Sequence, residues 1–170
     1  MATPIWVLTG LYWIHILATI TWLGSQGFWA WIKSQEARGG SNQVLYAGLV
    51  QTYQRRLIAV GWLSLMLLAA TGMFQMSANI NYRGFLAIVN TWAVAILVKH
   101  ILYAVLIASN LYLTWGLTPA MDRTRLRVSR GLATAGEAIL RLKSQETWLI
   151  RFNLGLTVVI LIFTALARST

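Results

Sequence analysis

The chain has 170 residues, of which 58% are hydrophobic and only 11% are charged. Soluble domains average roughly 45–50% apolar and about 25% charged residues, so this composition excludes a disordered chain and argues against a soluble globular domain. There is no cysteine, which excludes disulfides and thiolate chemistry, and the net charge of +10 indicates lipid head groups rather than nucleic acid as the anionic partner.

Four apolar stretches follow one another along the chain. They cover approximately residues 5–32, 57–76, 85–115 and 147–167. Each reaches the ~20 residues that a helix needs to cross a ~30 Å hydrocarbon core. We therefore predict an all-α fold, a single integral membrane domain over residues 1–170 that is built as a four-transmembrane-helix bundle.

The two long connections between these stretches are basic. Residues 33–56 contain four basic residues and residues 116–146 contain six. The second connection also carries apolar residues at helical spacing, which predicts an amphipathic cytoplasmic connection lying on the membrane surface between the third and fourth spans. These apolar residues are Leu132, Ala135, Ile139 and Leu142.

The distribution of charge predicts the topology. The two basic connections together with Arg151 carry 11 of the 14 basic residues. Cytoplasmic loops of membrane proteins are enriched in Lys and Arg. We therefore expect a plasma membrane protein whose basic connections are cytoplasmic and whose two termini lie on the outer side.

Polar side chains inside the spans are the candidate functional residues. The first span carries them at steps of three or four, which places them on one helix face. In the third span, Lys99 directly precedes His100, and Tyr103 shares the face of His100. The residues of the first stripe are Tyr12, His15, Thr19, Trp22 and Gln26.

His15 and His100 are the chain's two histidines, and both fall inside predicted spans. Their depths differ by about 7 Å at 1.5 Å per residue, so the two side chains can share one layer of the bilayer. Two facing imidazoles on neighbouring helices are one way to hold a haem iron from both sides, with Tyr12, Trp22 and Tyr103 around it. The alternative is that each histidine only hydrogen-bonds a neighbouring helix.

Lys99 is a costly residue in this position. A Lys near the centre of the bilayer costs about 2.5–3.5 kcal/mol on insertion scales, and no carboxylate lies in any predicted span. Four alternatives follow for Lys99. It is neutral, it bonds to Asn or Thr side chains, it faces an anion such as a haem propionate or a porphyrin carboxylate, or it extends toward the interface along its helix.

Met73 and Met76 form an M-x-x-M pair near the outer end of the second span. Two thioethers on one helix face are soft ligands for Cu(I), and His15 or His100 would complete such a metal site. The alternative is that both methionines are flexible packing residues, as is common in apolar helices.

The spans resemble those of the copper-resistance protein D (CopD)-like membrane family. In that family the opening helix carries a His followed seven residues later by Trp and then Gly, as in LYWIHILATITWLGSQGFWAWI here. The third and last spans resemble its Lys-containing helix and its closing helix. The matching positions are His15, Trp22, Gly24, Lys99, Pro119, Asn153 and Gly155.

The related HemJ-like proteins also have four spans, a first-helix His and a third-helix Lys, and are associated with haem b and protoporphyrinogen oxidation. This resemblance implies a bacterial plasma membrane protein in which His15 ligates haem and Lys99 faces the porphyrin as a candidate catalytic residue. His100, directly after Lys99, departs from the HemJ pattern.

Three functions are consistent with these features. The first is haem b binding between His15 and His100, for electron transfer or porphyrin oxidation by a membrane oxidoreductase. The second is copper binding or transport, with Met73, Met76 and His15 as first contacts. The third is a role as an accessory subunit of a larger respiratory or photosynthetic complex, or as a homo-oligomer, without chemistry of its own.

Overall fold

The computed structural model describes residues 4–38, 43–84, 88, 90–132 and 134–169, and this part of the chain is helical without a strand. The elements are α1 (Ile5–Arg38), α2 (Gln43–Ser77), α3 (Thr91–Leu111), the π-helix η1 (Tyr112–Leu117), α4 (Thr118–Ser129) and α5 (Thr134–Ser169). Within these residues, four helical stretches are long and apolar enough to cross a membrane. The predicted all-α four-helix bundle is confirmed.

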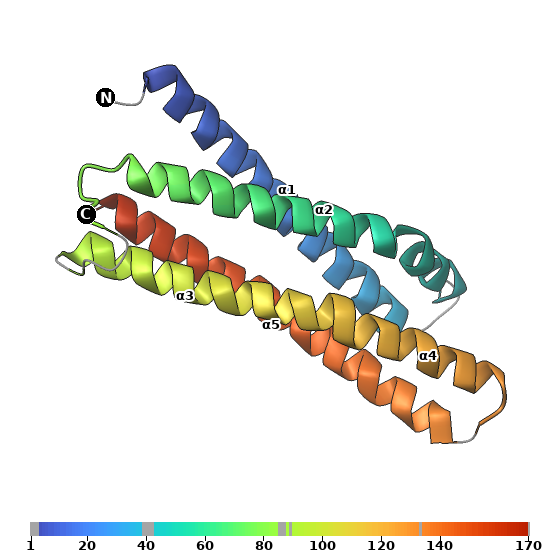
Figure 1. The fold of residues 1–170 in the computed structure, drawn as a ribbon. Helices are drawn as coiled ribbons and strands as arrows, with labels where there is room; N and C mark the ends of the chain where they lie inside the picture. The colour runs from blue at the N-terminus through green and yellow to red at the C-terminus, as the bar shows by residue number, and fades with distance from the viewer. Residues whose placement is uncertain (1–3, 39–42, 85–87, 89, 133, 170) are drawn as a thin grey trace.

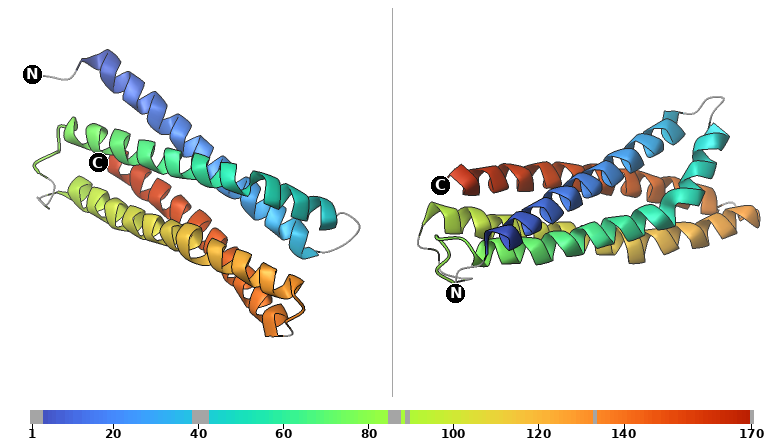
Figure 2. Two further views of the ribbon diagram at one scale, coloured as in Figure 1. Left: turned by 45° about the vertical axis from the view of Figure 1, so that its right-hand side comes forward. Right: turned by 90° about the horizontal axis from the view of Figure 1, so that it is seen from above.

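The helices run lengthwise beside one another, with α1 against α2 and α5, and α3 against α5. The two chain termini and the connection between α2 and α3 lie at one end of the bundle (Figures 1 and 2). The C-terminal turns of α1, the first turns of α2, helix α4 and the first turns of α5 lie at the other end. We call it the basic end because residues 33–56 and 116–146 together with Arg151 carry 11 of the 14 basic residues. The end with the termini is called the opposite end.

The third span continues without a break through η1 into α4 (Figure 1). It begins at Thr91, where the Asn90 side chain accepts a hydrogen bond from the Ala93 amide and caps the helix. Pro119 has no amide hydrogen and clashes with the preceding turn of a regular α-helix. The wider π turn immediately before it relieves this conflict, and the Thr118 hydroxyl bonds the Leu113 carbonyl at 2.8 Å.

The amphipathic stripe before the fourth span does not form a separate helix on the membrane surface, contrary to our expectation. Residues 134–169 form one continuous helix, since no proline interrupts them. Ile139 and Leu142 pack with Leu117, Met121 and Leu149. The stripe is apolar because it packs the first turns of α5 against η1 and α4.

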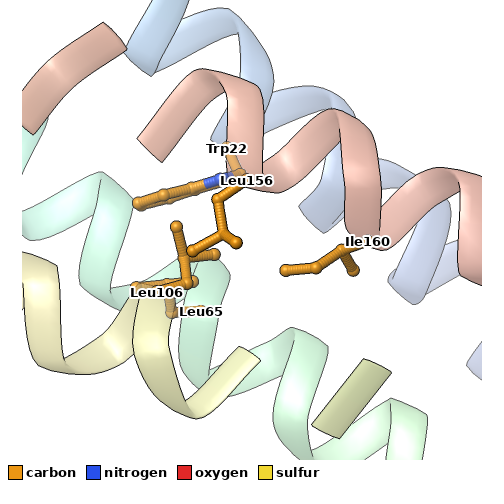
Figure 3. Close-up of a cluster of buried hydrophobic side chains, with 5 residues drawn as sticks. All are labelled: Trp22, Leu65, Leu106, Leu156 and Ile160. Carbon is orange, nitrogen blue, oxygen red and sulfur yellow. The ribbon is translucent and has the colours of Figure 1, made fainter. Parts of the chain in front are cut away.

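The middle of the bundle is closed by an apolar cluster to which all four spans contribute (Figure 3). Trp22 is its largest member and is only 1% exposed. The indole N–H of Trp22 donates to the Thr157 hydroxyl at 3.1 Å, so its one polar atom is satisfied. We call this cluster the apolar plug; its members are Trp22, Leu65, Leu106, Leu156 and Ile160.

Large apolar side chains cover the outside of the bundle. Ile20, Leu63 and Ile162 are 60–61% exposed and come from three different spans. A soluble monomer rarely exposes apolar surface on this scale. The chain is therefore a membrane protein whose outer surface contacts lipid.

Candidate functional site

His15 lies in the half of the bundle near the opposite end, between α1 and α2. Its Nδ1 is 2.7 Å from the Thr71 hydroxyl oxygen of α2. The imidazole packs against Gly72, where an added Cβ would lie 3.5 Å from its Cε1 atom. A Cβ at this distance would make an ordinary van der Waals contact, so α2 offers His15 a polar partner in Thr71 and a close-packed surface at Gly72.

The hydrogen bonds around Thr71 assign the His15 tautomer. The Thr71 hydroxyl donates to the Leu67 carbonyl of its own helix. Because its hydrogen is used there, the Thr71 oxygen accepts from His15, and the imidazole proton lies on Nδ1. Nε2 then keeps its lone pair, which is the arrangement found in metal-ligating histidines.

Two cations lie close to His15. Lys99 of α3 and Arg168 of α5 are both within electrostatic range of the imidazole and of each other. The Arg168 guanidinium also stacks on the Tyr12 ring, 4.9 Å from its centroid. We call Tyr12, His15, Lys99 and Arg168 the cationic cluster.

The cationic cluster has no acidic side chain beside it among the described residues. The four acidic residues of the chain stand at positions 36, 122, 137 and 146, toward the basic end. Lys99 is half-buried and makes no hydrogen bond or ion pair with a described residue. Among the described residues no negative charge therefore compensates the mutual repulsion of Lys99 and Arg168, and the cluster is suited to an anion.

His100 lies in a different environment. Its Nδ1–H donates to the Ile96 carbonyl of the same helix at 2.7 Å. It lines a small cavity with Met76 of α2 and Trp92 of α3. His15 does not line this cavity. The structure thus brings His15 together with Lys99, and His100 together with Met76.

Trp22 and Tyr103, predicted to surround a cofactor, have structural contacts. Trp22 belongs to the apolar plug, and Tyr103 packs against it. The Tyr103 hydroxyl donates to the Leu65 carbonyl and so ties α3 to α2.

The two methionines of the M-x-x-M pair differ in their surroundings. Met73 is 55% exposed on the outside of α2, whereas Met76 is 7% exposed and packs with Trp92, Ala95 and Ala167. Among the described residues there is no group of three or more His, Cys, Asp or Glu side chains that would hold a metal ion. Of the two thioethers, only Met76 lines the cavity of His100.

Sequence reasoning missed Arg168 and the role of Thr71. Arg168 is close to the C-terminal end of its span, where a basic residue is ordinarily read as an interfacial anchor. Thr71 lies in an apolar helix in which threonine usually bonds its own backbone. Only the packing of α2 and α5 beside α1 reveals that Thr71 contacts His15 and that Arg168 stacks on Tyr12, one turn away on the same helix.

No protein-family model, curated protein or solved structure matches the chain. The fold and the four apolar helices define its class as a four-helix integral membrane protein. The likeness to the CopD and HemJ families stays a prediction that rests on the residues quoted for it.

Proposed function

We propose that this membrane protein binds haem b, or a closely related tetrapyrrole carboxylate, at the cationic cluster. The proposal rests on two features that occur together. The His15 Nδ1–H is hydrogen-bonded to Thr71, and two basic side chains within electrostatic range of His15 have no acidic partner among the described residues. A haem presents the complementary groups, an iron that takes an imidazole nitrogen and propionates that carry negative charge.

Each residue of the cluster has a distinct task in this proposal. Thr71 orients the His15 ring, so that Nε2 is the nitrogen offered to iron. Lys99 and Arg168 pair with the carboxylates, and Tyr12 holds the Arg168 guanidinium in place. Bound haem would supply one-electron chemistry. His100 lines a separate cavity with Met76 and is not part of this cluster.

The space around the cluster limits where a tetrapyrrole can lie. The cavities of the bundle measure about 40 and 20 Å³, which is far smaller than a porphyrin. Tyr12 and Arg168, in contrast, are exposed at the end of the bundle. The donor set fits haem, and the macrocycle would lie against the exposed side of His15 toward the opposite end rather than inside the apolar plug.

The same proposal includes an orientation. With the basic end in the cytoplasm, as the positive-inside rule requires, the cationic cluster faces the outer leaflet. Lys99 and Arg168 are then two of the three basic residues on the side where membrane proteins carry few, and Arg83 in the α2–α3 connection is the third. This placement supports a ligand-binding role for them over a topological one.

Copper binding is a second candidate, and the shared cavity of Met76 and His100 favours it. A thioether and an imidazole are both ligands for Cu(I). A Met76→Leu variant that binds Cu(I) as tightly as the unaltered protein would remove this candidate, and Met73→Leu serves as its matched control because Met73 is exposed.

The haem proposal is tested by comparing haem with its dimethyl ester, in which the propionate charges are removed. We expect the unaltered protein to prefer haem over the ester by about tenfold or more in spectroscopic titration, since charge-assisted pairs contribute about 1.5–3 kcal/mol. Lys99→Met and Arg168→Met should each reduce that preference. The control is Arg83→Gln, which removes an exposed base near the same end. Equal affinity for haem and ester in the unaltered protein contradicts the carboxylate-pairing role.

A further inference from the structure

A cavity with a mixed lining, mainly of aromatic and aliphatic side chains with five hydrogen-bonding residues among them, lies on the other side of the apolar plug, toward the basic end. It has a volume of about 40 Å³. Trp22 and Leu65 belong both to its wall and to the apolar plug, so the plug separates it from the cationic cluster. Its hydrogen-bonding lining comes from α1, α2, α3 and η1 and consists of Ser25, Gln26, Gln54, Asn110 and Thr114.

A buried polar atom in this part of the bundle lacks a partner. The Gln26 Oε1 atom is buried and accepts no hydrogen bond, although it belongs to a residue that lines the cavity. More than 90% of buried polar groups in proteins are bonded to protein or to ordered water. The unpartnered Gln26 oxygen therefore indicates that the cavity contains a hydrogen-bond donor.

The backbone around the cavity is also irregular. The π-helix η1 supplies the lining residues Leu113 and Thr114, and π turns inside helices occur frequently at functional sites. The Thr114 hydroxyl accepts from the Trp62 indole at 3.2 Å, which fixes one wall. Since α2 packs mainly on α1 and α3 mainly on α5, the cavity occupies the seam between the two helix pairs.

We propose that this cavity is a hydrated chamber that binds small uncharged hydrogen-bond donors, water first among them. One water needs ~10–15 Å³ on this measure, so about three fit into the volume. The lining offers amides, hydroxyls, indole rings and aliphatic side chains but no charged side chain, so it has no group that would hold an ion in place, although a small monovalent cation such as Ag⁺ can enter with the water. Gln54 lies on the side of the chamber toward the basic end, and the apolar plug closes the chamber on the other side.

Single cysteines test the hydration of the chamber, because the native chain has none. Ser25→Cys places a thiol at the chamber wall, and Ser64→Cys is the matched control. Both serines donate to a carbonyl of their own helix, at 2.8 and 2.9 Å, but Ser64 is 3% exposed and does not line the chamber. The probe is Ag⁺, which is small and reacts with thiolates in water.

The protein is held in lipid nanodiscs, treated with Ag⁺, denatured and then labelled with a maleimide dye. We expect Ser25→Cys to be protected from the dye by Ag⁺ at least tenfold faster than Ser64→Cys, and Gln54→Cys at the rim to react fastest. Gln26→Cys carries the same expectation if Ser25→Cys unfolds. A Ser25 thiol as slow as the Ser64 thiol means that the chamber is dry, and equally fast reaction at both means that the interior has no distinct chamber. Either result overturns the proposal. The test does not depend on haem binding.

Discussion

Lys33 and Glu146 form the most deeply buried ion pair that the described residues contain. The Lys33 Nζ atom lies 2.8 Å from the Glu146 Oε2 atom, and both side chains are 5% exposed. The Lys33 ammonium also lies 5.1 Å from the centroid of the Trp29 ring. The pair joins α1 to α5 near the basic end. The attraction between the two charges offsets the free-energy cost of burying them only while both partners are present.

Removing one partner of this pair should therefore destabilise the bundle strongly. We expect Lys33→Met to lower the free energy of unfolding by about 3–5 kcal/mol, because it leaves an uncompensated buried carboxylate. The double variant Lys33→Met with Glu146→Met should recover most of this loss. Unfolding in detergent, followed by circular dichroism, measures both effects.

The control for this prediction is the exposed pair of Asp122 and Arg125. Their side chains are 62% and 38% exposed, and the charged atoms are 3.6 Å apart. Exposed pairs contribute less than about 1 kcal/mol, so Asp122→Asn should change stability little. If Lys33→Met were as mild as Asp122→Asn, the buried pair would not hold α1 and α5 together.

The helices are joined into a bundle by a few polar contacts between otherwise apolar faces. Between α2 and the long α3–η1–α4 helix, two of them are the Tyr103 hydroxyl on the Leu65 carbonyl and the Trp62 indole on the Thr114 hydroxyl. Trp62 also packs against Trp115, with ring centroids 5.1 Å apart. These contacts matter because lipid tails are as apolar as the side chains and give no hydrophobic drive for helix association.

Tyr103→Phe should accordingly loosen α2 from α3. We expect a loss of about 1 kcal/mol in the free energy of unfolding, since one interhelical hydrogen bond is removed while the ring is kept. The comparison variant is Tyr112→Phe on the same long helix, whose ring is 54% exposed. Equal stability of the two variants would mean that the Tyr103 hydroxyl does not tie the helices together.

For the whole molecule, the number, order and approximate position of the spans were predictable, because they depend only on the length and composition of apolar stretches. The side-chain contacts between helices were not predictable. Most faces of these helices are apolar, so periodicity alone does not show which neighbour each face meets. Lys33 and Glu146 were assigned to basic connections, and nothing in their local sequence indicates that they meet. Likewise, nothing in the local sequence of Arg168 indicates that it lies within electrostatic range of His15.

The orientation of the molecule is a prediction for intact cells. With the basic end in the cytoplasm, Ser129→Cys in α4 should be protected from a membrane-impermeant maleimide, and Ala78→Cys in the α2–α3 connection should react. Both positions are exposed in the structure and lie at different ends of the bundle. The reverse pattern of labelling would show that the +10 net charge does not set the topology in the expected way.

The central claim is that His15 is a haem ligand at the cationic cluster, and the absorption spectrum of the purified protein tests it most directly. Protein prepared in mild detergent from haem-supplied cells should show reduced b-type bands, and His15→Ala should abolish or shift them. Thr19→Ala is the control, because Thr19 lies one turn away on α1 and bonds only the His15 carbonyl of its own helix, at 2.8 Å. A folded, haem-free protein, or bands unchanged by His15→Ala, would contradict the claim.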